Sequence, residues 1–400
     1  MKRTAKKYVL LASLLVLSST AGAESYYSFF GLGMPHYYVS PQAVGMGGAG
    51  MAVQQYLSLN EMNPAGIDLK GFTMISASFQ GEIVNNTVSG ETIQTRKGSA
   101  SGFRFVIPLK KNRLAFIAGL KPLTESEMSF DFQQQYDNFN LLRSISTSGG
   151  LSAASIGLKY AIFPRLSVGG LFNFNFGAFN EKWRSDFDDD TYLDTKDDIS
   201  SHMWGSSAEL GLIYKPTAFV SLAGILRTQS KLHLETTIIP GSGIALAPIS
   251  QTATYPLAFG FGGAVDLTKI LLAADFYSQK WKSYRLDGNK DAFLTDYIRG
   301  SAGIEYVGSK DFLAGYTKRI AYRLGASWSQ LPFLDQQAHP VKELLGTIGF
   351  GFPFNKNMGR IDIAVEAGKR FSTDSAPYSE RIVRVSACVT SAEQWFKRIF

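Results

Sequence analysis

The stretch "RLSVGGLFNFNFGAFN", residues 165–180, alternates large apolar side chains with small or polar ones. The apolar phase holds Leu166, Val168, Phe172, Phe174 and Phe176. The opposite phase holds Ser167, Gly169, Asn173 and Asn175. Because successive side chains of a β-strand point to opposite faces, this period of two predicts a strand with one apolar and one polar face.

The connections between such stretches separate a soluble sandwich from a membrane barrel. From residue 71 onward six connections are short: 110–112, 163–165, 215–217, 266–269, 308–311 and 354–359. Seven long polar segments alternate with them, at about 81–98, 124–148, 181–202, 231–252, 281–296, 330–342 and 371–379. A Greek-key sandwich does not produce this alternation. It predicts an all-β fold: a 14-stranded antiparallel transmembrane β-barrel with both chain ends on the short-turn side.

The composition supports a barrel that crosses a membrane. The 400 residues include 39 glycines, 13% are aromatic and only 18% are charged. After the first residues no segment has 18 consecutive apolar residues, as expected for strands that face lipid on one side only. Aromatic residues of the apolar phase next to short connections are Tyr160, Tyr214, Tyr306 and Phe352, which predicts an interfacial girdle.

Residues 1–23 have the three parts of a secretory signal peptide. Four cations precede the apolar run 8–17, and Ala21-Gly22-Ala23 forms a cleavage site. The apolar run is too short to span a bilayer as a helix. We therefore expect cleavage near Ala23 and a location in the outer membrane of a Gram-negative cell.

The overall charge gives no reason to expect a nucleic-acid partner. Four of the 40 Lys and Arg residues lie in the leader, so 36 of them face 33 Asp and Glu residues in the mature chain. The single cysteine, Cys388, allows no intramolecular disulfide.

Residues 24–70 precede the first strand, and we expect them to start on the short-turn side and to fill the lumen as a plug, with the barrel at 71–400. Within them Gly45, Gly47 and Gly50 match the dinucleotide pattern G-x-G-x-x-G. That pattern is specific only between a strand and a helix, and two prolines in the preceding residues disfavour a strand. The glycines instead predict close packing of the plug, and we expect no cofactor.

The third predicted strand contains an irregularity in "FIAGLKPLTESEMSF", residues 116–130. Gly119 is followed by Pro122, which cannot donate a hydrogen bond to a strand ladder. In a barrel wall a proline marks a bulge, a kink or a strand end. The alternative is that Pro122 only starts the long loop.

The polar phase of the strands predicts a charged lumen. Its bases are Arg104, Lys159, Arg227, Arg323 and Arg384. Its acids are Glu209, Asp275, Glu305, Asp362 and Glu366. Such groups brace the wall by pairing with one another, because unpaired buried charge is costly. Alternatively one or two of the cations hold an anionic head group.

Taken together, "GMGGAGMAV" (45–53), the following Asn63-Pro64-Ala65-Gly66, the strand number and the N-terminal plug resemble the long-chain fatty acid transporters of the outer membrane, a family that includes aromatic-hydrocarbon channels. Later stretches such as "LLAADFYSQKW" (271–281), "GIEY" (303–306), "YRLGASW" (322–328) and "GFGFPF" (349–354) are also similar to that family.

The resemblance implies a mechanism. A hydrophobic molecule enters from outside, binds beside the plug and leaves sideways into the membrane where the third strand kinks. Asn63, Pro64 and Ala65 match the hatch motif of the family, with Gly66 next to it, and Gly119 and Pro122 fall on its third strand. The implied partners are a hydrophobic ligand (a fatty acid or an aromatic hydrocarbon) and outer-membrane lipids.

Other functions are less well supported. A hydrolase would need a base, and His36, His202, His233 and His339 fall in the plug or in the predicted loops, so we expect no enzyme. The acidic stretch 186–202 lacks EF-hand spacing, so we expect no metal. A more serious alternative is a non-transporting barrel that serves a protein-export or surface-assembly machine. We expect a monomer, since the barrel closes its own edges.

Overall fold

The structure, a computed structural model, describes residues 25–37, 40–55, 57, 59–68, 71–88, 91–135, 140–188, 193–335, 337–372 and 378–393. The predicted signal peptide lies outside these residues.

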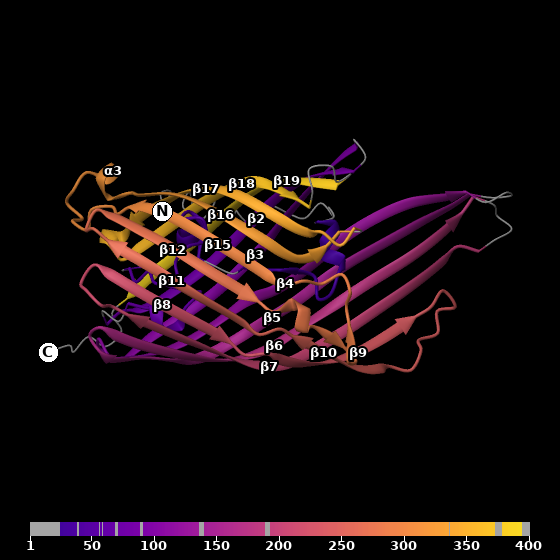
Figure 1. The fold of residues 1–400 in the computed structure, drawn as a ribbon, viewed down its shortest axis with the longest axis horizontal. Helices are drawn as coiled ribbons and strands as arrows, with labels where there is room; N and C mark the ends of the chain where they lie inside the picture. Colours follow the sequence, from indigo (N-terminus) through magenta and orange to yellow (C-terminus); the bar gives the residue numbers. More distant parts are fainter. Residues whose placement is uncertain are drawn as a thin grey trace, which may run out of the picture.

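Fourteen wall strands form one closed antiparallel barrel, as predicted (Figure 1). The first six are β2 (Thr73–Val88), β3 (Glu91–Lys110), β4 (Leu114–Gln135), β5 (Asn140–Phe163), β6 (Leu166–Phe187) and β7 (Thr195–Tyr214). The next two are each interrupted: β8 (Val220–Arg227) with β9 (Ser230–Ile239), then β10 (Ile249–Tyr255) with β11 (Ala258–Asp266). The last six are β12 (Ile270–Gln279), β15 (Tyr297–Tyr306), β16 (Ala321–Leu334), β17 (Pro340–Phe354), β18 (Gly359–Phe371) and β19 (Tyr378–Glu393). The barrel closes where β19 pairs with β2 from Tyr378↔Val88 to Glu393↔Thr73.

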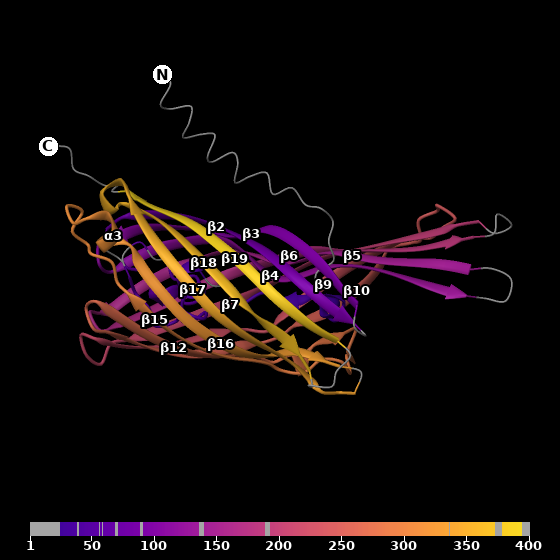
Figure 2. The same cartoon turned by 90° about the horizontal axis from the view of Figure 1, so that it is seen from above.

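The two ends of the barrel differ from the predicted connections. The segments predicted as long loops are largely strand, because the hairpins continue beyond the wall: β4 to β7 project far past the barrel mouth (Figures 1 and 2). The loop 281–296 instead holds η3 (Trp281–Ser283), β13 (Arg285–Leu286) and β14 (Asn289–Lys290). At the other end, the predicted tight turn at 308–311 is part of a longer connection, 307–320, which contains α3 (Tyr316–Arg319). The remaining five connections at that end are short, and one contains η4 (Asn355–Asn357).

Side-chain exposure follows the predicted alternation. Phe172, Phe174 and Phe176 are 54%, 49% and 37% exposed on the outer face. On the inner face between them, Asn173 and Asn175 are almost fully buried and hydrogen-bond Ser207 of the next strand at 3.4 and 3.2 Å. The outward apolar band suits lipid, and the inward polar groups satisfy one another.

The described residues between 25 and 68, which we call the plug, lie inside the barrel (Figure 1). The plug contains η1 (Tyr26–Phe29), β1 (Met34–Pro35), α2 (Pro41–Val44) and η2 (Pro64–Gly66). The Ser25 hydroxyl donates to Glu380, near the long-loop end, whereas Lys159 near the short-turn end donates to the Ile67 carbonyl. The expectation that the plug starts on the short-turn side is therefore wrong. Ser25 lies at the long-loop end, and the described plug residues run from there to Ile67 near the short-turn end.

Among the described residues no helix has the length and apolar character that crossing a membrane requires.

Candidate functional site

The third wall strand loses its neighbour halfway along. The β3–β4 ladder runs from Lys110↔Leu114 to Phe103↔Leu120. Beyond that point β3 stays paired with β2 to Glu91, and β4 stays paired with β5 to Gln135. Within these described strands no ladder joins the outer halves of β3 and β4. We call this seam the β3–β4 gap.

Gly119 and Pro122 lie where the gap begins. Gly119 pairs with Arg104, one position before the ladder ends, and a Cβ at Gly119 would approach the Phe103 carbonyl to 2.9 Å. Pro122 is inside β4, which continues for thirteen residues, so it does not start a loop. The β4–β5 register shifts between Pro122 and Thr124. The irregularity is thus a bulge within a strand, as expected of proline in a sheet.

The plug and one side chain span the gap. Strand β1 pairs with the free edge of β4 at Met34↔Glu125 and Pro35↔Thr124, and the His36 amide donates to the Leu123 carbonyl at 2.9 Å. From the β3 side, the Lys97 ammonium lies 2.6 Å from Glu125 and 3.0 Å from Glu127.

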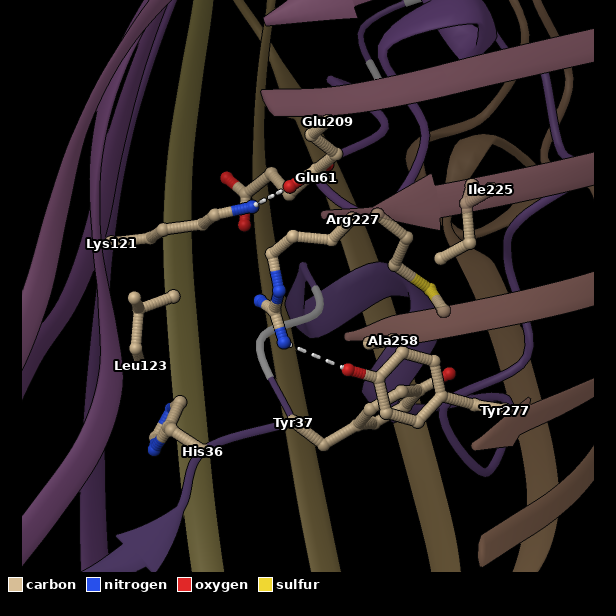
Figure 3. Close-up of a pocket in the computed structure, with 11 residues that line it drawn as sticks. His36, Tyr37, Glu61, Lys121, Leu123, Glu209, Ile225, Arg227, Ala258 and Tyr277 are labelled. Atoms are coloured by element: carbon tan, nitrogen blue, oxygen red, sulfur yellow. Dashed lines mark hydrogen bonds and ion pairs between the residues drawn. The ribbon is translucent and has the colours of Figure 1, made fainter. Parts of the chain in front are cut away.

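A cavity of about 40 Å³ lies beside the gap, between plug and wall (Figure 3). Its lining comes from the plug and from strands β4, β7, β8, β11 and β12: His36, Tyr37, Glu61, Met62, Lys121, Leu123, Glu209, Ile225, Arg227, Ala258 and Tyr277. The Lys121 ammonium lies 2.7 Å from Glu209, and Arg227 donates to the Tyr277 hydroxyl at 3.0 Å (Figure 3). Two cations and two carboxylates therefore line one small space with apolar neighbours.

Of the plug residues that face this cavity, His36 and Tyr37 are half-buried, and Glu61 and Met62 are buried. Burial lowers the pKa of the His36 imidazole below its ordinary value; Glu125 and Glu82 oppose this shift, and Arg384 and Lys97 add to it. The Tyr37 ring lies 5.1 Å from the Tyr277 ring and 4.6 Å from the Arg299 guanidinium. These surroundings disfavour the charged form of His36.

The hatch motif, Asn63–Ala65, anchors the plug to the wall. We call the part of the plug that lies towards the short-turn end the lower plug. Asn63 caps η2 by accepting from the Ala65 amide at 2.9 Å, and its amide donates to the carbonyls of Met51 and Leu212, both at 3.2 Å. On the wall, a Cβ at Gly211 would lie 2.1 Å from Asn63 Oδ1, and one at Gly169 would lie 2.5 Å from the Pro64 carbonyl carbon. Glycine in the wall thus lets the motif approach the strands directly.

The glycine-rich stretch is fixed in the same way. Gly47 and Gly48 have positive φ angles of 72° and 86°. Asp275 accepts from the amides of Gly50 and Met51 at 2.6 and 2.8 Å, and Arg299 donates to the Gly47 carbonyl at 3.0 Å. The stretch packs on wall strands, and the described residues around it form no dinucleotide-type βαβ unit.

The five predicted lumen cations have different surroundings. Arg104 donates to the Asn60 and Glu61 carbonyls, Arg323 pairs with Glu305 and Asp362, and Arg384 pairs with Glu82 and Glu343. Only Arg227 of the five lines the cavity beside the gap. Arg104, Lys159, Arg323 and Arg384 thus hold the plug or the wall together.

The sequence reasoning missed several residues of this region. Lys121 is directly before the bulge, where the inside–outside phase of β4 is ambiguous. Arg299 and Arg370 share the inward phase of their strands and could have been found by extending the alternation. Asn60, whose amide holds the carbonyls of Gly50, Met51 and Val53, carries no sequence signal.

A second cavity, about 80 Å³, is lined by both residues of β1, Met34 and Pro35. It is polar and includes Arg299, Glu343, Glu366 and Arg370 in its lining. Arg370 pairs with both Glu343 and Glu380, and Arg384 pairs with Glu343 and Glu82, so this region contains a network of ion pairs. No group of three or more His, Cys, Asp or Glu side chains that could hold a metal occurs in the part of the chain that is described, which omits part of the acidic stretch 186–202.

The fold is similar to solved outer-membrane channels. The toluene transporter TbuX of Ralstonia pickettii is 14% identical, with a TM-score of 0.59 over 88% of this chain and 97% of its own. A FadL homologue of Pseudomonas aeruginosa is 13% identical, with a TM-score of 0.62 over 90% and 99%. The toluene transporter TodX of P. putida is 15% identical, with a TM-score of 0.59 over 91% and 100%. At this identity the likeness establishes the fold, which is that of the family the sequence resembles.

No curated protein matches the sequence. The sequence model of one family, BamG, matches residues 1–399. Since this match covers nearly the whole chain, the protein belongs to the BamG family.

Proposed function

We propose that this protein is an outer-membrane channel that takes up small hydrophobic molecules, binds them beside the plug and releases them sideways through the β3–β4 gap. The observation that carries the proposal is the loss of wall pairing beyond Leu120, next to a lumen cavity lined by Lys121 and Leu123 of the same strand. Solved barrels of this fold include proteins described as toluene transporters, which supports the same class of ligand.

Lateral release follows from the chemistry of the ligand. A hydrophobic molecule that left into water would lose about 0.8 kcal/mol of burial free energy per CH₂. Exit between strands delivers it directly to the lipid, past the outward apolar side chains Phe103 and Leu120, which are 41% and 46% exposed.

The charges around the cavity favour a neutral ligand. Lys121 is paired with Glu209, and Arg227 shares the space with the carboxylates of Glu209 and Glu61. An anionic head group would have to compete with these carboxylates for the same cations. An aromatic hydrocarbon, which is neutral, therefore suits the charges of this cavity better than a fatty acid.

Binding requires part of the plug to move. An engineered protein-core cavity that binds benzene has a volume of about 150 Å³, whereas the cavity here is about 40 Å³. The lower plug is fastened by Asn63 and Asp275, whereas β1 is held to β4 by a two-residue ladder. We infer that residues 32–37 move to widen the cavity and uncover the gap.

The small cavity also favours the second candidate, a non-transporting barrel that serves an export or surface-assembly machine. A barrel with this role needs the fold and a fixed plug but no space for a ligand.

Mass spectrometry of molecules that co-purify with the detergent-extracted barrel separates the two functions. The channel predicts a defined hydrophobic molecule, reduced in Asn63→Ala and Pro122→Ala variants and retained in a loop variant, Asn289→Ala. An empty barrel that brings down partner proteins instead would contradict uptake and support the assembly role.

We further propose that the mature chain starts near residue 24 after signal-peptide cleavage, comprises the plug to residue 70 and the barrel from 71, and acts as a monomer.

A further inference from the structure

The short-turn end of the barrel carries a ring of exposed cations. Every one of its six connections contains at least one Lys or Arg. On five of the connections, or in the strand residue next to them, the cations are exposed: Lys110, Lys111, Arg113, Arg165, Lys269, Lys310, Lys318 and Lys356. We call this set the basic rim.

The acidic side chains of these connections do not pair with the basic rim. The same connections contain two acids, and both serve their own turns: Asp266 accepts from the Thr268 amide and Asp311 from the Leu313 amide, each at 2.9 Å. Among the described residues no member of the rim forms an ion pair with a carboxylate. At the long-loop end, by contrast, Lys196 pairs with Asp198 and Lys280 with Asp296.

The basic rim borders the lipid-facing band. The Arg113 guanidinium donates to the Tyr160 hydroxyl at 3.0 Å and lies 5.4 Å from the centre of that ring, and Tyr160 is itself exposed on the outer face. An aromatic ring at the membrane interface with a cation just beyond it is the arrangement that places the cation at lipid head groups.

The long connection 307–320 adds an apolar anchor. It leaves the wall between Tyr306 and Tyr322, which are 46% and 41% exposed and whose ring centres lie 6.4 Å apart. At its tip Phe312, Leu313 and Tyr316 are 50%, 79% and 52% exposed. Figures 1 and 2 show α3 at this end of the barrel. Exposed aromatic and aliphatic side chains among lysines are typical of segments that lie in the head-group region.

We propose that the basic rim binds the anionic phosphodiester head groups of the leaflet on the short-turn side, and that the tip of 307–320 inserts at the same level. The exposed cations occur on five of the six connections, so they are spread around the barrel as a leaflet is, whereas a folded protein partner would meet one patch. This inference is independent of transport.

Native mass spectrometry tests the lipid preference. The full chain is equilibrated in detergent with equimolar phosphatidylglycerol and phosphatidylcholine, and the bound lipids are counted. Each cation near an anionic lipid surface contributes on the order of 1 kcal/mol to binding, which corresponds to about a fivefold change in the binding constant. We expect at least a fivefold excess of bound phosphatidylglycerol, lost in a Lys110→Gln, Lys111→Gln, Lys269→Gln variant.

The matched control removes three exposed cations from the long-loop end, by Lys182→Gln, Lys282→Gln and Lys290→Gln, and should keep the excess. Heat-modifiable gel migration verifies that each variant is a folded barrel. If the rim variant does not fold, a Lys310→Gln, Lys318→Gln variant takes its place. Equal binding of the two lipids by the wild type, or equal losses in rim and control variants, would overturn the proposal.

A spin label tests the anchor. The label is attached to Leu313→Cys, in a Cys388→Ala background and in vesicles of the same two lipids. Collisions with oxygen should enhance its spin relaxation more than collisions with a water-soluble nickel chelate do. A label at Ile244→Cys, 74% exposed at the long-loop end, should show the reverse. Greater access of nickel at residue 313 would show that the tip faces water or a partner and would contradict insertion.

Discussion

At the scale of single residues, small side chains decide how closely the plug meets the wall. Gly45 and Gly349 approach each other so closely that a Cβ on either would lie 2.8 Å from the other's Cα. Hydrogen bonds to buried charged groups, such as Asp275 and Arg299, then fix the stretch at one height in the barrel. Each such bond contributes about 1.5–3 kcal/mol, so the lower plug is a rigid part of the protein.

Gly47→Ala should release the glycine-rich stretch from the wall. Gly47 has φ 72°, and a Cβ there would lie 2.3 Å from the Ala326 carbonyl oxygen. Backbone strain alone costs about 1–2 kcal/mol, and the clash adds to it. Hydrogen exchange of residues 43–53 should rise at least tenfold. Gly243→Ala, with φ 77° and open space around it, should leave exchange in the plug unchanged; equal effects of both substitutions would contradict the packing role.

Acidification should loosen the segment that carries His36. Burial lowers the pKa of this imidazole, so the docked segment binds a proton less readily than the released one. Above pH about 6.5 both states are neutral, and below it protonation increasingly favours release, until the docked imidazole is protonated too. Exchange of residues 32–37, corrected for intrinsic rates, should be faster at pH 5.5 than at pH 7.5. His36→Gln should abolish the difference and His339→Gln should keep it; a pH effect that survives His36→Gln would exclude the imidazole as its source.

At the scale of elements, the sequence predicted the wall well and the ends poorly. Apolar and polar side chains alternate in a strand because only one of its faces meets lipid, so residues 165–180 are enough to predict β6. The hairpins that project beyond the wall have no lipid to face, so their polar residues read as loops although the backbone stays paired. Lys121 was missed because a bulge reverses the phase of the alternation, and the lost pairing between β3 and β4 has no signal beyond Gly119 and Pro122.

The ion pairs of Lys97 should hold the β3–β4 gap closed. Because Lys97 is 13% exposed and its partners Glu125 and Glu127 are 25% and 36% exposed, solvent screens the interaction to about 1 kcal/mol or less. Lys97→Gln should therefore raise exchange of residues 123–131 by up to about fivefold. Lys196→Gln, which removes an exposed ion pair with Asp198 elsewhere, should not change it. Unaltered protection in Lys97→Gln would mean that β1 alone closes the gap.

At the scale of the whole molecule, strand number and plug could be foreseen, and the course of the plug could not. The count of connections fixes the number of strands, and 47 residues before the first strand of a wide barrel predict a filled lumen. Nothing in those residues indicates that Ser25 lies at the outer end, because that position depends on contacts with Glu380, 355 residues away. The position of the plug also decides which of the five predicted lumen cations line the cavity. Only Arg227 does.

If the β3–β4 gap is the exit for the ligand, reversible closure of the gap should reversibly block uptake. Ser101→Cys with Thr124→Cys, in a Cys388→Ala background, places thiols beyond the last paired residues of β3 and β4. A bifunctional thiol reagent should abolish uptake of labelled toluene by cells, and a reagent with a reducible spacer should allow recovery after reduction. Gly81→Cys with Gly98→Cys, which are already paired between β2 and β3, should leave uptake unchanged when cross-linked. Full uptake with the gap cross-linked would contradict lateral exit.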